Sequence, residues 1–177
     1  MADRRIFHAM NPMDNTTQHY AAPWGRNLVI TSLFVIAVCG VGFLLPWFAG
    51  TKLAAWKSVL LASLLVLPVL FIIRGYEIGQ GDLFIKRLFW RTRIPLSDLE
   101  NAEVMPDVMK GSLRLFGNGG AYVISGWFRN RTLGGYRAFV NNDANSVVLK
   151  FRSRTIVVSP GSPDDFVSNL RTRIKDA

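Results

Sequence analysis

The amino-acid sequence predicts two unlike parts, an α-helical membrane hairpin followed by an all-β sandwich or barrel with a C-terminal helix. Two long apolar runs lie within the first 74 residues, and short apolar runs separated by turn residues fill the remainder. Only 19% of the 177 residues are charged, and the mean hydropathy is +0.22. The abundance of aromatic and branched aliphatic residues excludes a disordered chain, and the single cysteine excludes a disulfide scaffold.

The first apolar run has no charged residue over the 25 positions from Asn27 to Thr51. A bilayer core of about 30 Å needs roughly 20 apolar residues in a helix, so this run predicts a membrane span at about 27–49. The alternatives are a buried helix of a soluble core and a cleaved signal peptide. The polar remainder is too small to cover two such helices, and the run exceeds the ~7–15 residues of a signal-peptide apolar region.

The second apolar run covers the 21 residues from Leu53 to Ile73, with Lys57 as its one charge. We expect a second span at about 53–74, in which Lys57 lies near one end and reaches the headgroups. Few residues join the runs, so they predict a tight hairpin with both termini on one side. Basic residues in the 1–26 tail and after the second span outnumber those of the hairpin loop, which favours cytoplasmic termini at a bacterial inner membrane.

Residues 75–177 carry 15 basic and 10 acidic side chains and read as a polar β domain of net charge +5. Gly, Pro and Asn clusters divide this part into short apolar segments at the spacing of an all-β sandwich or barrel. Residues 142–145 and 152–154 are expected to close two successive hairpins. The predicted strands are Leu83–Phe89, Thr92–Pro95, Ala102–Met105, Leu113–Phe116, Ala121–Ile124, Tyr136–Val140, Ser146–Phe151 and Thr155–Ser159.

The last segment predicts an amphipathic helix over 163–175. Ser162 is a helix N-cap, Pro163 suits the first turn, and Asp164 and Asp165 favour the positive helix end. Phe166 and Leu170 then lie on one helical face with Val167 and Ile174. We expect this apolar face to cap one end or face of the β-structure.

Five segments of the polar domain together carry a family resemblance: Ile94–Val104, Arg114–Gly120, Gly126–Phe128, Leu133–Ala138 and Val157–Phe166. They resemble segments of the bacterial pleckstrin-homology (PH)-like domain family. The family implies a β-sandwich of about seven strands with a C-terminal capping helix, often joined to a short transmembrane hairpin. Its members mostly lack an assigned activity, so the resemblance concerns the fold more than the function.

The residues for common catalytic and metal sites are missing from the polar domain. Both histidines, His8 and His19, precede the spans, and Cys39 lies within the first span. This composition excludes Ser-His-Asp and Cys-His catalysis and a His/Cys zinc site from residues 75–177. We therefore expect no enzyme activity, no metal and no cofactor.

A glycine-rich segment that begins at Arg114 is the candidate anion loop. Its backbone N–H groups could hold a phosphate, yet it lacks the Gly-Lys-Ser/Thr ending of a P-loop and no helix pattern follows it. The favoured alternative is a hairpin turn whose residues adopt positive φ. The residues concerned are Arg114, Gly117, Asn118, Gly119 and Gly120.

Basic and aromatic residues alternate between positions 86 and 93. They are a candidate surface for anionic lipid headgroups or a protein partner; nucleic-acid binding and an ordinary solvated strand face are the alternatives. Part of the basic excess flanks the membrane and sets its topology, so the charge does not argue for nucleic acid. The candidate residues are Lys86, Arg87, Trp90, Arg91 and Arg93.

These observations predict a non-catalytic, membrane-anchored PH-like module that binds a protein partner or anionic lipid at the cytoplasmic membrane surface. The alternative is a structural subunit of a homo-oligomer or a larger membrane complex. An enzyme with an unrecognised site and a nucleic-acid binder are less favoured.

Overall fold

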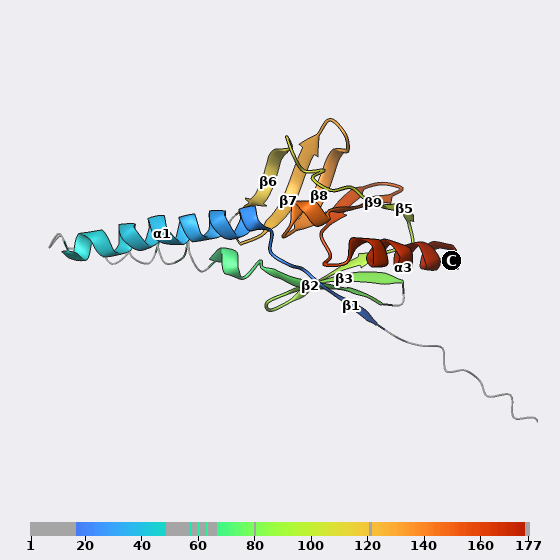
Figure 1. The fold of residues 1–177 in the computed structure, drawn as a ribbon, viewed down its shortest axis with the longest axis horizontal. Coiled ribbons are helices and arrows are strands. Elements are labelled where there is room, and N and C mark those ends of the chain that lie inside the picture. Colours follow the sequence, from blue (N-terminus) through green and yellow to red (C-terminus); the bar gives the residue numbers. More distant parts are fainter. Residues whose placement is uncertain are drawn as a thin grey trace, which may run out of the picture.

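The computed structural model describes residues 17–48, 67–79, 81–120 and 122–175, together with the helical positions Lys57, Leu60 and Ser63. The described chain forms two β-sheets, one long helix that leaves them at one end, and a second helix at the opposite end (Figure 1). Most of the second predicted span, 53–74, lies outside the described residues.

Helix α1, Arg26–Phe48, confirms the helix expected at about 27–49. It projects away from the sheets along most of its length (Figure 1). Among the described residues it is the one helix whose length and composition suit a membrane crossing, with a mean hydropathy of 2.3 over Arg26–Leu44 and 11% of that window buried. Its two hydroxyl side chains bond within the helix, Thr31 to the carbonyl oxygen of Asn27 and Ser32 to that of Leu28.

Sheet A contains four antiparallel strands in the order β1-β2-β3-β4. Strand β1 lies within the segment expected to be an N-terminal tail, and its pairing with β2 joins the two sides of the apolar runs in the sequence. Strand β2 corrects the expected second span, because Ile73 and Arg74 belong to the sheet rather than to a helix ending at 74. The strands are β1 (Gln18–Ala21), β2 (Ile73–Ile78), β3 (Asp82–Arg87) and β4 (Arg91–Pro95).

Sheet B contains six strands in the order β5-β9-β10-β8-β7-β6. The turn at 152–154 joins the antiparallel pair β9–β10 as predicted. The predicted hairpin at 142–145 is wrong, because β10 lies between β8 and β9 and pairs with β8 in parallel. The strands are β5 (Leu99–Val104), β6 (Leu113–Gly119), β7 (Ile124–Asn130), β8 (Gly134–Val140), β9 (Val147–Phe151) and β10 (Thr155–Val158).

The described residues thus contain ten strands rather than about seven, although the two-sheet architecture with a C-terminal helix agrees with the prediction. The strand predicted at Ala121–Ile124 is wrong in its bounds, because strand β7 begins at Ile124 and its pairing extends to Asn130. A one-turn 3-10 helix, η1 (Asp143–Asn145), follows β8 where the hairpin was expected.

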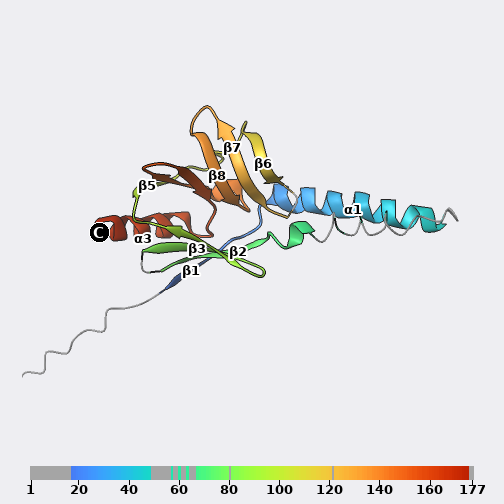
Figure 2. The ribbon, with the colours of Figure 1, turned by 180° about the vertical axis from the view of Figure 1, so that it is seen from behind.

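Helix α3, Pro163–Lys175, confirms the predicted C-terminal helix and closes the end of the sandwich away from α1 (Figures 1 and 2). Phe166 and Leu170 are fully buried in the main core, where inner residues of both sheets meet. The ring of Tyr76 lies edge-on to Phe166, and its hydroxyl donates to the carbonyl oxygen of Phe139 at 2.7 Å. Burial raises the pKa of Tyr76 to about 12.

A smaller apolar cluster covers the outer face of sheet B. Phe128 and Tyr136 stack at a centroid distance of 6.0 Å, and the turn at 105–112 packs over them through Met105, Val108 and Met109. This turn and the first residues of α1 line a common cavity.

Candidate functional site

The junction between α1 and the domain is fastened by one buried amide side chain, that of Asn141 at the end of β8. Its Nδ2 donates to the carbonyl oxygen of Ala22 at 3.1 Å and to that of Ile73 at 2.8 Å. Its backbone carbonyl oxygen accepts from the N–H of Gly25 at 2.9 Å. Ala22 precedes α1, whereas Ile73 follows the second apolar run, so a single side chain holds both ends of the intervening segment.

A second attachment joins the domain to the end of the second apolar run. Arg87, on the inner face of β3, donates from Nη1 to the carbonyl oxygen of Phe71 at 2.8 Å and from Nη2 to Ser125 Oγ at 3.0 Å. Its guanidinium lies 5.8 Å from the ring centroids of both Phe71 and Trp90. Burial, and next the charge of Arg137, lower the pKa of Arg87.

The structure does not gather the five basic and aromatic candidates of 86–93 on one surface. Successive side chains of a strand point to opposite faces, so Lys86 lies on the outer face of sheet A while Arg87 is buried between the sheets. Arg91 pairs with Lys86 across β3 and β4, and Arg93 pairs with Phe84, which places both on the outer face. Trp90 lies in the turn between the strands, next to Phe71.

Two acidic residues that sequence reasoning missed partner the outer basic side chains. Glu77, only 5% exposed, accepts from Lys86 at 3.0 Å and lies 3.6 Å from Arg91. Asp82 pairs with Arg93 at 2.8 Å. The register β2–β3–β4 brings Glu77 beside these cations, and no signal in the sequence indicates that pairing.

A cavity of about 390 Å³ opens beside Lys86 at the end of sheet A. Its charged lining residues are basic, and the carboxylate of Glu77 pairs with two lining residues, His19 at 2.9 Å and Lys86 at 3.0 Å. Arg74, one of its exposed members, is the first charged residue after the second apolar run. The lining residues are His19, Tyr20, Ala21, Arg74, Gly75, Tyr76, Lys86 and Arg87.

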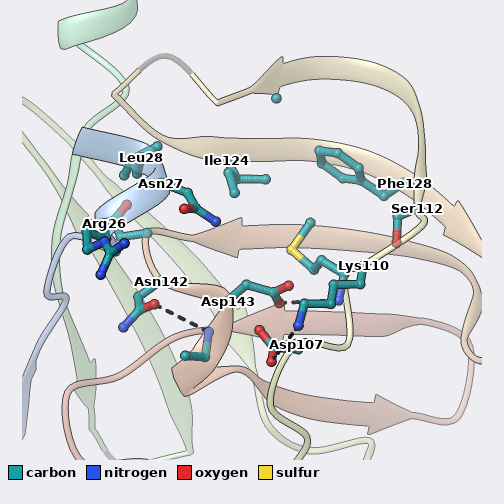
Figure 3. A pocket seen from close by; sticks show the side chains of 15 residues that line it. Arg26, Asn27, Leu28, Asp107, Lys110, Ser112, Ile124, Phe128, Asn142 and Asp143 are labelled. Atoms are coloured by element: carbon teal, nitrogen blue, oxygen red, sulfur yellow. Dashed lines mark hydrogen bonds and ion pairs between the residues drawn. The ribbon is translucent and has the colours of Figure 1, made fainter. Parts of the chain in front are cut away.

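A larger cavity, of about 530 Å³, lies between the start of α1 and the turn at 105–112 (Figure 3). Its charged lining residues are two bases, Arg26 and Lys110, and two acids, Asp107 and Asp143. Lys110 pairs with Asp107 at 2.9 Å. Because the charges balance, this cavity has no preference for an anion.

Asp143 has a structural role in that cavity. Its carboxylate accepts from Ser146 Oγ at 2.8 Å and from the N–H of Met109 at 3.2 Å, which fastens the turn to η1. Burial is the largest cause that raises the pKa of Asp143, partly offset by these two hydrogen bonds.

The glycine-rich segment continues the β6–β7 ladder instead of forming an open phosphate loop. Gly117 opposes Gly126, and both have positive φ, at 109° and 155°. A Cβ on Gly117 would approach Gly126 Cα to 2.6 Å, so the glycines permit close approach of the two strands. The side chain of Arg114 covers Gly119, and Asn118 Oδ1 accepts from the N–H of Gly120 at 3.3 Å.

The tip of this hairpin contacts α1. The N–H of Tyr122 donates to Ser32 Oγ at 2.9 Å, and both residues are buried. Ser32 lies in the second turn of α1, so the tip reaches along the helix beyond its first residue. The anion-loop candidates therefore lie beside the helix that the sequence assigns to the membrane.

Strand β6 exposes a row of apolar side chains at the free edge of sheet B. Leu113, Leu115 and Phe116 are 67%, 58% and 78% exposed, and Trp127 on the neighbouring strand β7 is 48% exposed. The other edge strand, β5, is contacted by α3, whose Arg171 donates from Nε to the carbonyl oxygen of Ala102. Within the described residues, no three His, Cys, Asp or Glu side chains group in a way that could hold a metal ion.

The family comparison matches the part of the chain that forms the two sheets and α3. The model of the bacterial PH domain family matches residues 74–174, more than half of the chain. Domains of this kind are generally non-catalytic. No curated protein and no solved structure gives a significant match.

Proposed function

Because the chain belongs to the bacterial PH domain family, we propose that it is a non-catalytic binding module that a two-helix hairpin anchors to the bacterial inner membrane. Both termini are cytoplasmic in this proposal, and the module binds anionic lipid headgroups or a protein partner at the membrane surface. The first helix of the hairpin is α1, and the second is the apolar run that ends near Phe71.

The pairing of β1 with β2 carries this proposal. Strand β1 precedes α1, and β2 follows the second apolar run, yet Tyr20 lies opposite Tyr76 in one sheet. A chain that leaves a sheet through a membrane and returns to the same sheet crosses that membrane an even number of times. This topology supports a second crossing by the other apolar run wherever α1 crosses, and the lengths of both runs suit a bilayer.

The positions of the flanking cations support the orientation. Arg26 begins α1, and Arg74 follows the second run at the start of β2. Both belong to the end of the domain from which α1 emerges (Figures 1 and 2). Lys and Arg concentrated on one side of short spans favour the cytoplasm on that side.

The basic cavity beside Lys86 is the best-supported headgroup site. The position of Arg74 directly after the second apolar run supports a cavity near the membrane surface, and Lys86 and His19 line it from β3 and β1. Each Lys or Arg near an anionic membrane contributes about 1 kcal/mol of attraction. Arg87 contributes less than the sequence implied because it is buried. Arg93 and Lys86 also contribute less, because they are paired with Asp82 and Glu77, so Arg74 is the main attraction for an anion in this cavity.

Native mass spectrometry of the full chain in mild detergent tests this site. We expect bound phosphatidylglycerol to exceed phosphatidylcholine, and the combined change Arg74→Ala and Lys86→Ala to abolish the preference. Arg129→Ala with Arg131→Ala removes the same charge from the end of β7 and the turn after it, and should leave the lipid preference unchanged. If both double variants lose the preference for phosphatidylglycerol equally, net charge alone, and not the cavity, attracts the lipid.

Strand β6 favours a second candidate function, a subunit that assembles through this edge. An edge strand presents unpaired backbone groups, and an exposed apolar row on it is a surface on which another chain can pair. The mass of the full chain in detergent tests this alternative. We expect Phe116→Asp to reduce any multimer to a monomer, and Phe89→Asp, an equally exposed aromatic outside β6, to leave it intact; a multimer that survives Phe116→Asp rules out assembly through β6.

A further inference from the structure

The turn between β3 and β4 consists of three apolar residues that lie on the surface of the domain. Leu88, Phe89 and Trp90 are 39%, 73% and 39% exposed. Arg87 and Arg91 flank them, and the N–H of Arg87 donates to the carbonyl oxygen of Trp90 at 2.9 Å. An exposed run of large apolar side chains between two cations, in a closed turn, has no role in the core of the domain.

Contacts with Phe71 fix the position of this turn relative to the anchor. The rings of Phe71 and Trp90 meet edge to face at a centroid distance of 5.4 Å and an angle of 86°. Arg87 bonds to the backbone of both residues, to the carbonyl oxygen of Phe71 through its side chain and to that of Trp90 through its N–H. The turn is therefore held beside the last residues of the second apolar run.

The turn also lies at the end of the domain that would face the membrane. It is found at the end of sheet A from which the anchor leaves, on the side of α1 opposite to β6 (Figures 1 and 2). Phe71 belongs to an uncharged stretch that begins at Ser58 and ends at Ile73. A residue beside Phe71 thus lies at the boundary of any bilayer that this stretch enters.

We propose that the Leu88–Trp90 turn inserts into the interfacial layer of the bilayer that the anchor crosses, with Phe89 in contact with lipid acyl chains. This inference rests on the membrane anchor of the proposed function and adds a third attachment, separate from the helices and from the headgroup cavity.

The chemistry of the turn fits this position. Trp favours the headgroup level because its ring is apolar and its N–H is polar, and Phe favours the adjacent acyl boundary. Arg91, which is 65% exposed at its side chain, extends from the turn toward the outer face, where phosphates would lie. Insertion of the turn would hold sheet A against the membrane and keep Arg74 and Lys86 at headgroup level.

Fluorescence quenching in vesicles tests the insertion with the full chain. In a Cys39→Ala background, Phe89→Cys and, separately, Leu88→Cys carry a nitrobenzoxadiazole label. The protein is reconstituted into phosphatidylcholine vesicles with phosphatidylglycerol and nitroxide lipids, shallow ones for the turn and control sites and deep ones for Cys39. Ser153→Cys, in the exposed turn between β9 and β10, is the matched control site on the same domain. The native Cys39, labelled in the unaltered chain, reports on the anchor.

We expect the labels at 88 and 89 to be quenched at least threefold more than the label at 153, with Cys39 also quenched. Quenching at Cys39 with equal, weak quenching at 88, 89 and 153 would overturn the insertion and leave the anchor standing. Absence of quenching at Cys39 would overturn the anchor itself, and the insertion with it.

Discussion

Arg87 donates a hydrogen bond to the carbonyl oxygen of Phe71 at 2.8 Å and thereby joins the β domain to the end of the second apolar run. The last carbonyl groups of a helix lack partners within it, and a cation there also interacts favourably with the negative end of the helix. The residues from Leu67 to Phe71 end in such a turn, with bonds from Leu70 to Leu67 and from Phe71 to Pro68. Arg87 is therefore a cap that the domain supplies to the turn at the end of the second apolar run.

Removal of this cap should loosen the anchor–domain junction. Arg87→Met retains the apolar stem but deletes both side-chain hydrogen bonds, and an unpaired buried acceptor costs about 1–3 kcal/mol. We expect faster amide hydrogen exchange over residues 67–73 in the full chain in detergent.

The matched control is Arg93→Met, which removes a more exposed cation from the next strand and its pair with Asp82. Exchange over 67–73 should be unchanged in this variant. Equal exchange in Arg87→Met and the unaltered chain would show that the bond to Phe71 does not hold the junction.

Loss of the Asn141 amide should destabilise the whole domain. Asn141→Ala leaves the carbonyl oxygens of Ala22 and Ile73 without this donor, and both residues are buried. The expected cost is about 1–3 kcal/mol. For a domain of this size each kcal/mol lowers Tm by about 4–8 °C.

Tm of the full chain in detergent, followed by intrinsic tryptophan fluorescence, measures the effect. Asn145→Ala is the control, because its side chain makes only a long bond of 3.4 Å to the carbonyl oxygen of Pro160. A Tm for Asn141→Ala equal to that of Asn145→Ala would show that the two hydrogen bonds of the Asn141 amide do not stabilise the domain.

Asp143 should make stability depend on pH. Burial raises its pKa above the ordinary 3.8, so the folded protein binds this proton more tightly than the unfolded chain does. Protonation of Asp143 therefore adds its full contribution to the free energy of unfolding below the pKa of the unfolded chain. The contribution is lost as pH rises through the higher pKa of the folded protein. Asn at this position can still accept from Ser146 and Met109 but has no proton to lose.

We expect the stability of Asp143→Asn relative to the unaltered chain to increase from acid to neutral pH. Tm measured in detergent across that range checks this, with the exposed Asp98→Asn as the control for general charge effects. A difference in Tm between Asp143→Asn and the unaltered chain that stays constant over this pH range would refute the link between Asp143 protonation and stability.

The long-range pairings explain which parts of the fold the sequence could predict. Helices α1 and α3 follow from local signals, an uncharged run and a capped amphipathic segment, and both lie where expected. Strand β1 has no such signal, because its four residues are mostly polar and its partner lies more than 50 residues away. The prediction of a hairpin at 142–145 was wrong because of another pairing that no local signal indicates: β10 lies between β8 and β9.

The boundaries near apolar residues were also hard to predict. Ile73 continues an apolar run without interruption, so composition does not distinguish the end of the run from the start of β2. Gly126 interrupts the pattern of β7, whose backbone nevertheless continues through a close pairing with Gly117.

The candidate site was predictable in its residues but not in its arrangement. The period of two along a strand already separates Lys86 from Arg87. The neutralisation of Lys86 and Arg91 by Glu77 depends on the register of three strands, which no local pattern determines. The contribution of His19 to the basic cavity likewise depends on β1.

In the proposed topology both flanks of the membrane hairpin lie on one side of the membrane. Labelling with a membrane-impermeant maleimide in sealed inverted vesicles tests this topology, with single cysteines at Gln18, Ser153 and Thr51 in a Cys39→Ala background. We expect the cysteines at 18 and 153 to react from the same, cytoplasmic side and the cysteine at 51 to be protected until the vesicles are opened. Labelling of 18 and 153 from opposite sides, or of all three from one side, would contradict it.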